Sequence, residues 1–144
     1  MGAARRQLMV EAFLWLAFAR VALLIFPFRT LAARLGDALP PADAAARLAQ
    51  ARDPAGAAAL AKDIGWAVRR VAEYVPFRAV CLQQALAGKH MLRRRGISSA
   101  LHLGVATGGE VGEPMKAHAW LDAAGVKVTG YPFDAAYTEV AGFV

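Results

Sequence analysis

The stretch over residues 100–129, ALHLGVATGGEVGEPMKAHAWLDAAGVKVT, decides the fold class. Its first and middle parts alternate between apolar and other side chains with a period of two, which predicts β-strands. A glycine-rich segment separates the first two strands, and Ala123-Ala124-Gly125 predicts a tight turn before the third. The expected strands cover residues 100–106, 116–122 and 126–129, with a further one at 137–140. Strands joined in this succession indicate an antiparallel meander.

The chain before this stretch is rich in alanine and carries apolar residues at helical spacing. Leu60, Ile64 and Val68 belong to one such stripe. The expected helices cover residues 28–35, 44–51 with Asp43 as N-cap, 57–74, and 81–95 with Gly96 at the C-terminal stop. Helices followed by a small antiparallel sheet give an α+β fold. We expect one domain over residues 1–144, with a helical part at 1–75 and a core at 76–144.

Composition excludes several classes of protein. The chain has 144 residues, of which 58% are hydrophobic, and this apolar content excludes low-complexity disorder. One cysteine excludes both an intrachain disulfide and a cysteine-based metal site. The 17 Lys and Arg against 11 Asp and Glu give a net charge of +6, which favours acidic partners without choosing among peptide, nucleic acid and membrane surface. The apolar content also suggests a surface that a permanent partner covers.

The N-terminal sequence MGAARRQLMVEAFLWLAFARVALLIFPF admits three interpretations. Arg5-Arg6 before an apolar stretch resembles a signal sequence, but Glu11 and Arg20 interrupt the apolar region. A transmembrane helix would place Arg20 near mid-bilayer, at a cost of about 2.5–3.5 kcal/mol. The favoured interpretation is a strongly buried first helix that Pro27 stops, in a cytoplasmic protein.

Two residues have the chemistry of a thiol enzyme. Cys81 stands where a helix is expected to begin, and the positive end of a helix favours a thiolate. A lone cysteine in apolar sequence can equally be an inert core residue. His118 lies on the second expected strand, on the same face as Trp120 and Asp122, where a histidine can be a base or purely structural.

The other polar candidates are weaker. His90 is expected to be exposed on a helix, and His102 lies on the preceding strand, where it could line the same sheet. Gln83 and Gln84 could donate to an oxyanion or be solvated. The backbone N–H of Cys81 is a simpler oxyanion donor. Residues 93–95, RRR, fit a helix C-terminus electrostatically, or could bind an acidic peptide or partner.

A cysteine at a helix start and a histidine on a later strand follow the chain order of papain-like and transglutaminase-like enzymes. Four segments resemble, in order, the transglutaminase-like cysteine proteases of lasso-peptide biosynthesis, the B-type maturation proteins in their split form. The segments are VCL at 80–82, MLRRRGI at 91–97, LHLGVA at 101–106 and AHAWL at 117–121. Phe26-Pro27-Phe28 and Leu35-Gly36 are similar to the helical part of that family.

This resemblance implies a leader peptidase. Cys81 would be the nucleophile and His118 the general base, on a nucleophile helix packed against the sheet. No cofactor, metal or nucleic acid is implied. Because 144 residues of helices and one small sheet leave no room for another domain, we expect a separate leader-recognition protein to deliver the precursor peptide and a separate cyclase to follow. The alternatives are an acyl-transferring transglutaminase and a non-enzymatic adaptor that binds a membrane surface or partner through residues 8–28.

The third catalytic residue departs from the family pattern. The family places an Asp about a dozen residues after the histidine, and Gly130 stands there. If Asp122 and Lys127 flank the turn, His118 faces the chain near residue 131. Asp122 is four strand residues from His118, about 13 Å, which is too far for a hydrogen bond. Asp134 is the candidate third member, provided that Pro132 turns the chain. A backbone carbonyl or the hydroxyl of Thr129 is the alternative.

Overall fold

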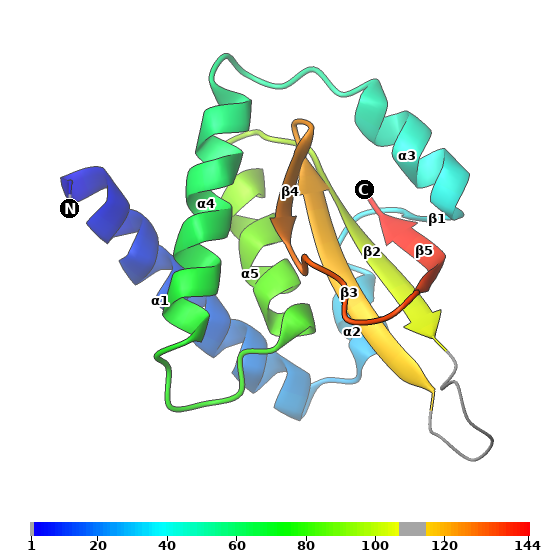
Figure 1. The fold of residues 1–144 in the computed structure, drawn as a ribbon, viewed down its shortest axis with the longest axis horizontal. Helices are drawn as coiled ribbons and strands as arrows, with labels where there is room; N and C mark the ends of the chain where they lie inside the picture. The colour runs from blue at the N-terminus through cyan, green and yellow to red at the C-terminus, as the bar shows by residue number, and fades with distance from the viewer. Residues whose placement is uncertain (1, 107–114) are drawn as a thin grey trace.

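The computed structural model describes residues 2–106 and 115–144, and over these it forms an α+β fold (Figure 1). The helices are α1 (Ala3–Ile25), α2 (Phe28–Ala32), α3 (Pro41–Ala49), α4 (Ala57–Ala72) and α5 (Cys81–Arg93). The strands are β1 (Ala38–Leu39), β2 (Ser99–Ala106), β3 (Lys116–Ala123), β4 (Val126–Thr129) and β5 (Thr138–Phe143). The predicted loop at 107–114 lies outside the described residues.

The strands form one sheet in the order β1-β5-β2-β3-β4, and every neighbouring pair is antiparallel. The predicted meander is confirmed as β2-β3-β4, and Asp122 faces Lys127 across the turn. A register shift follows between Leu121 and Asp122. The last strand starts at Thr138 and not at Tyr137, and it pairs with the other edge of β2. The short strand β1 was not predicted.

The helices cover the two faces of the sheet unequally. On one face, α5 packs against β3 and β2, and α4 packs against β4. Helix α1 lies across α4 and α5, so it forms an outer layer (Figure 1). Gly88 permits the close approach of α5 to β3, because a Cβ there would lie 2.8 Å from the side chain of Leu121. Helix α3 covers part of the opposite face, where Ala44 meets Gly142 of β5.

Three helix ends test the predicted boundaries. Helix α1 ends at Ile25, with Phe26 as its C-cap directly before Pro27, as predicted. Gly96 has a φ of +70° just beyond α5, which confirms it as the stop signal. The prediction of Asp43 as N-cap is wrong. Helix α3 begins at Pro41 and has Pro40 as its N-cap, because a proline suits the first helical position, and Asp43 lies in the first turn.

The outer face of α1 corrects the expectation of a strongly buried helix. Its inner face is buried through Leu8, Ala12, Leu16, Ala19 and Ala22. The opposite face is exposed and equally apolar. Its large exposed side chains are Val10, Phe13, Leu14, Phe18, Val21, Leu24 and Ile25. We call these seven residues the α1 outer face. A solvated helix face normally carries polar residues, so this face is unusual for a surface helix.

Candidate active site

Cys81 is the first residue of α5, where the sequence places the start of a helix. The first backbone bond of this helix runs from the N–H of Gln84 to the carbonyl of Val80 at 3.0 Å. The N–H groups of residues 81–83 therefore lack acceptors within the helix. These donors and the positive helix end can stabilise a thiolate or an oxyanion at Cys81. The thiol is free and half-buried.

His118 is the third residue of β3, and its ring is oriented by a backbone carbonyl. Nε2 of His118 lies 2.7 Å from the carbonyl oxygen of Gly130. Because a carbonyl only accepts, Nε2 must carry the proton of this bond. In the neutral ring, Nδ1 is then the nitrogen that can take a proton from a thiol. The backbone carbonyl that we considered as an alternative to a carboxylate is therefore the one that accepts the hydrogen bond from Nε2 of His118.

Aromatic side chains fix the plane of the His118 ring. Tyr137 stacks on it with ring centroids 4.8 Å apart, and Trp120 stacks at 5.8 Å. Phe133 meets the ring edge-on at 5.4 Å. Trp120 lies on the same face of β3 as His118, as expected, whereas Phe133 and Tyr137 come from the segment between β4 and β5. Such packing restricts the imidazole to a narrow set of orientations.

Tyr137 stacks on His118 and also responds to charge on Cys81. Figure 1 shows the start of α5 beside β3 and the segment after β4, and α5 packs against β3. The pKa of Tyr137 is raised to about 12, first by its hydrogen bond to Asp134, then by desolvation, and also by charge on Asp134 and Cys81. In residues 2–106 and 115–144, Sγ of Cys81 makes no hydrogen bond to the His118 ring. Catalytic hydrogen bonds are often formed fully only with substrate bound.

The carboxylate of Asp134 bonds to Tyr137 and not to His118. Oδ1 of Asp134 accepts a hydrogen bond of 2.5 Å from the Tyr137 hydroxyl, and this bond lowers the pKa of the carboxyl. Asp134 therefore contacts the ring that stacks on His118, while Gly130 holds Nε2. The hydroxyl of Thr129, the other alternative, is buried with no hydrogen-bond partner in the described chain. A role for Asp134 in catalysis stays a prediction.

Several weaker candidates have structural places. His90 is not exposed as expected, because its ring stacks on Trp15 at 4.5 Å. Gln84 donates to the carbonyl of Ala79 at 2.9 Å, which closes the loop before α5. Gln83 is buried, so a solvated position is wrong for this residue.

The arginine run at the end of α5 holds neighbouring segments. Nη2 of Arg95 lies 2.6 Å from Oε2 of Glu11, and Nη1 of Arg94 lies 3.0 Å from Oε1, which ties α1 to α5. Nη1 of Arg93 donates to the carbonyl of Arg34 at 3.0 Å. These contacts give all three arginines structural partners.

A comparison with known protein families bears on these residues. The model described as the transglutaminase-like superfamily matches residues 22–141, a span that includes Cys81 and His118. The chain belongs to the transglutaminase-like superfamily. This superfamily typically contains cysteine-dependent enzymes, so the assignment is consistent with a protease or a transferase. No curated protein and no solved structure matches the chain. The transglutaminase-like match begins within α1, and residues 3–21 of that helix precede it.

Sequence reasoning missed two partners in this transglutaminase-like site. Glu139 contacts His102, and the hydroxyl of Tyr131 donates to Asp122 at 2.7 Å. Glu139 was missed because the pairing of β5 with β2 was not predicted. Tyr131 could have been found, since the predicted register already placed the chain near residue 131 beside β3.

Proposed function

We propose that this protein is a leader peptidase that cleaves the leader from a ribosomally synthesised lasso-peptide precursor. The observation that carries the proposal is the orientation of His118 by the Gly130 carbonyl at 2.7 Å, on a strand whose AHAWL motif resembles the leader peptidases. This bond leaves Nδ1 to act on a thiol. Cys81 at the start of α5 supplies that thiol.

The reaction follows thiol-protease chemistry. The Cys81 thiolate attacks the carbonyl carbon of the scissile amide, and the free N–H groups at the start of α5 stabilise the oxyanion. The C–N bond breaks as the protonated His118 gives its proton to the leaving amine. Water then attacks the thioester, His118 takes a proton from that water, and the C–S bond breaks to release the leader acid and regenerate the thiolate.

Mass spectrometry of the cognate precursor tests this function. We expect two products, leader and core, whose masses sum to the precursor plus one water, and no cleavage with Cys81→Ala. With a primary amine added, a leader product heavier than the leader acid by the mass of that amine minus one water would show acyl transfer in place of hydrolysis. An intact precursor with the wild-type protein and its recognition partner, together with a Cys81 thiol inert to iodoacetamide, would contradict both reactions.

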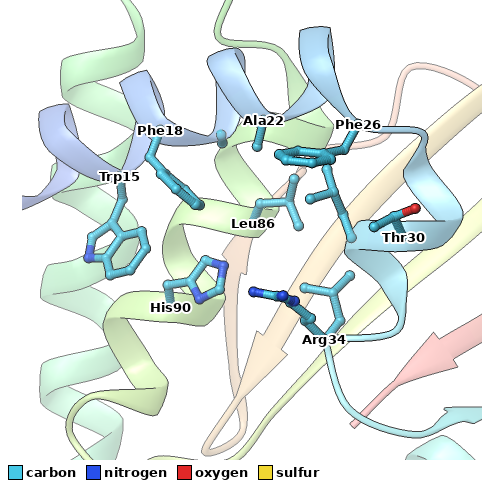
Figure 2. A pocket seen from close by; sticks show the side chains of 11 residues that line it. Trp15, Phe18, Ala22, Phe26, Thr30, Arg34, Leu86 and His90 are labelled. Atoms are coloured by element: carbon cyan, nitrogen blue, oxygen red, sulfur yellow. The ribbon is translucent and has the colours of Figure 1, made fainter.

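The α1 outer face supports the part of the proposal that concerns a partner. Large exposed apolar side chains on one surface are typical of a protein interface. Beside them lies an apolar hollow of about 270 Å³ between α1, α2 and α5. Figure 2 shows Trp15, Phe18 and Phe26 on the α1 side of this hollow, with Arg34 and His90 across from them. We propose that the leader-recognition protein binds here, with an apolar side chain in the hollow and a carboxylate near Arg34.

Introducing a negative charge at apolar positions of the α1 outer face separates this partner role from catalysis. We expect Val21→Glu and Leu24→Glu to abolish stimulation of cleavage by the recognition protein, while alkylation of Cys81 stays at the wild-type rate. Val140→Glu is the matched control, because Val140 is an exposed apolar residue on β5. If the α1 variants are stimulated like wild type, the partner binds elsewhere.

A second candidate function, a membrane-surface adaptor, is favoured by one property of α1. The helix spans 23 residues, with a mean hydropathy of 2.1 in its most apolar window, of which 28% is buried. By length and composition it could also cross a membrane. Sedimentation with phosphatidylglycerol vesicles, lost in Leu24→Glu, together with an unreactive Cys81 would favour the adaptor over the peptidase. Wild-type protein that stays in the supernatant would contradict it.

A further inference from the structure

His102 is a buried histidine held between two carboxylates on neighbouring strands. Only 6% of the residue is exposed, on β2 in the centre of the sheet. Its Nε2 lies 3.1 Å from Oδ2 of Asp122 on β3, and its Nδ1 contacts Oε1 of Glu139 on β5. Burial alone would lower the pKa of His102, but the contacts with Asp122 and Glu139 outweigh it, and the pKa is raised. This cluster therefore favours a charged imidazolium within the sheet.

Asp122 connects this cluster to the segment that orients His118. Its Oδ2 faces His102, and its Oδ1 accepts the hydrogen bond of 2.7 Å from the hydroxyl of Tyr131. Tyr131 directly follows Gly130, whose carbonyl holds Nε2 of His118. One carboxylate thus anchors the residue adjacent to the carbonyl that takes the place of a third catalytic residue.

A second connection runs through the rings on the same face of the sheet. Trp120 lies between His102 and His118, with ring centroids 5.5 Å and 5.8 Å away and interplanar angles of 20° and 24°. Gly104 makes room for the indole, because a Cβ there would lie 2.7 Å from Trp120. The plane of His118 is therefore supported from His102 by stacking and from Asp122 by hydrogen bonding.

We propose that Asp122 is a positioning residue of the His118 site, acting through Tyr131 on the Gly130 carbonyl, with His102 holding its charge in place. It is too far along β3 to touch the reacting atoms, so it acts only through these neighbours. The proposal rests on the proposed function, since it requires His118 to act on Cys81. It goes further by assigning a positioning role to Asp122, whose distance from His118 excludes a direct hydrogen bond.

The test measures alkylation of Cys81 by iodoacetamide as a function of pH, which needs no precursor peptide. Tyr131→Phe removes only the hydroxyl that binds Asp122, and Asp122→Asn removes the charge that faces His102. We expect each to lower the alkylation rate at pH 7 about tenfold and to raise the pH of half-maximal rate. The double variant should be no slower than the slower single variant, because both changes break one link. Tyr74→Phe is the control, since Tyr74 is 70% exposed in the segment between α4 and α5, where its ring packs against Arg70.

Each outcome decides the proposal. Folded Tyr131→Phe and Asp122→Asn proteins with wild-type alkylation rates and pH profiles would overturn the positioning role of Asp122. Additive losses of rate in the double variant would show that the two residues do not act through their shared hydrogen bond. A purely structural role would lower the melting temperature without moving the pH of half-maximal alkylation, which also counts against it. If Asp122→Asn does not fold, Tyr131→Phe decides alone. If His118→Ala alkylates like wild type, the proposed function itself has failed.

Discussion

His118 and Gly130 are joined by a 2.7 Å hydrogen bond between ring nitrogen and backbone carbonyl, at the position where a carboxylate is expected. A carbonyl fixes the tautomer and orientation of the ring as a carboxylate would. It carries a dipole and no net charge, so it stabilises an imidazolium less. The proposed catalysis therefore depends more on the geometry around His118 than on the charge of a third residue.

The first prediction concerns the imidazole itself. His118→Ala should lower cleavage of the precursor by about 10²–10⁴-fold, the usual contribution of a positioned general acid and base. His118→Asn should restore none of this activity, because an amide retains polarity but takes up no proton. Product formation followed by mass spectrometry gives both rates. Activity within threefold of wild type in His118→Ala would remove this residue from the mechanism.

The second prediction compares two glycines with positive φ. Gly130 has a φ of +87°, and a Cβ there would lie 2.6 Å from the carbonyl oxygen of Ala119 and 2.7 Å from Cβ of Trp120. Gly125 has a φ of +75°, with open space where its Cβ would be. Gly125→Ala should cost about 1–2 kcal/mol in the free energy of unfolding from backbone strain alone, and leave cleavage intact.

Gly130→Ala should lower the free energy of unfolding more than Gly125→Ala does and abolish the proposed cleavage, because the added methyl must displace the chain that presents the carbonyl. Steric crowding of this kind adds about 1–3 kcal/mol. Urea unfolding gives the stabilities, and iodoacetamide alkylation of Cys81 gives the state of the site. Equal losses of stability in the two variants, with unchanged alkylation, would show that Gly130 is needed only for its backbone angle.

The third prediction concerns Asp134. If the Gly130 carbonyl orients His118, Asp134→Asn should lower cleavage by less than tenfold, since the amide oxygen can still accept from Tyr137. A catalytic carboxylate in a triad contributes about 10⁴-fold. The rate of cleavage at saturating precursor distinguishes the two. A loss near 10⁴-fold would restore Asp134 as the third member and assign the carbonyl a secondary role.

Periodicity and turn residues were enough to predict most of the fold. The strands β2, β3 and β4 and the turn between Asp122 and Lys127 follow from local alternation and from Gly125. The pairing of β5 with β2 could not be predicted, since contacts between strands distant in sequence leave no local pattern. The outer position of α1 could not be predicted for a different reason: its apolar residues occur all round the helix, so the sequence pattern does not distinguish a buried face from an exposed one.

The site was predictable to the level of residue types. Cys81 at a helix start and His118 on a strand follow from sequence. The hydrogen-bond acceptor of His118 does not, because it depends on the path that the backbone takes at Gly130, just after the end of β4. A carbonyl has no sequence signature, so it could be raised only as an alternative. Similarly, a distance along one strand excluded Asp122 from contact with His118, but said nothing of a route through Tyr131.

The last prediction concerns a buried lysine on α5. Lys89 is 3% exposed, and its Nζ donates to the carbonyl of Ser99 at 2.9 Å, the Ser99 hydroxyl at 3.1 Å and the carbonyl of Phe143 at 3.1 Å. Burial, and to a smaller extent the charge of Arg93, lowers the pKa of Lys89 from 10.5 to about 8. The unfolded chain therefore binds more protons at this lysine than the folded protein between pH 8 and 10.5.

It follows that Lys89 makes the free energy of unfolding rise with pH across this window, by about 3 kcal/mol, and has no such effect below pH 8. Lys89→Met should remove the rise, so wild type should gain on the variant between pH 7.5 and pH 10. Lys62→Met is the control, because Lys62 is exposed on α4 and should leave the slope unchanged. Urea unfolding of the three proteins at both pH values measures the difference. A constant gap between wild type and Lys89→Met would mean that Lys89 stays charged in the folded protein throughout, held by its three acceptors.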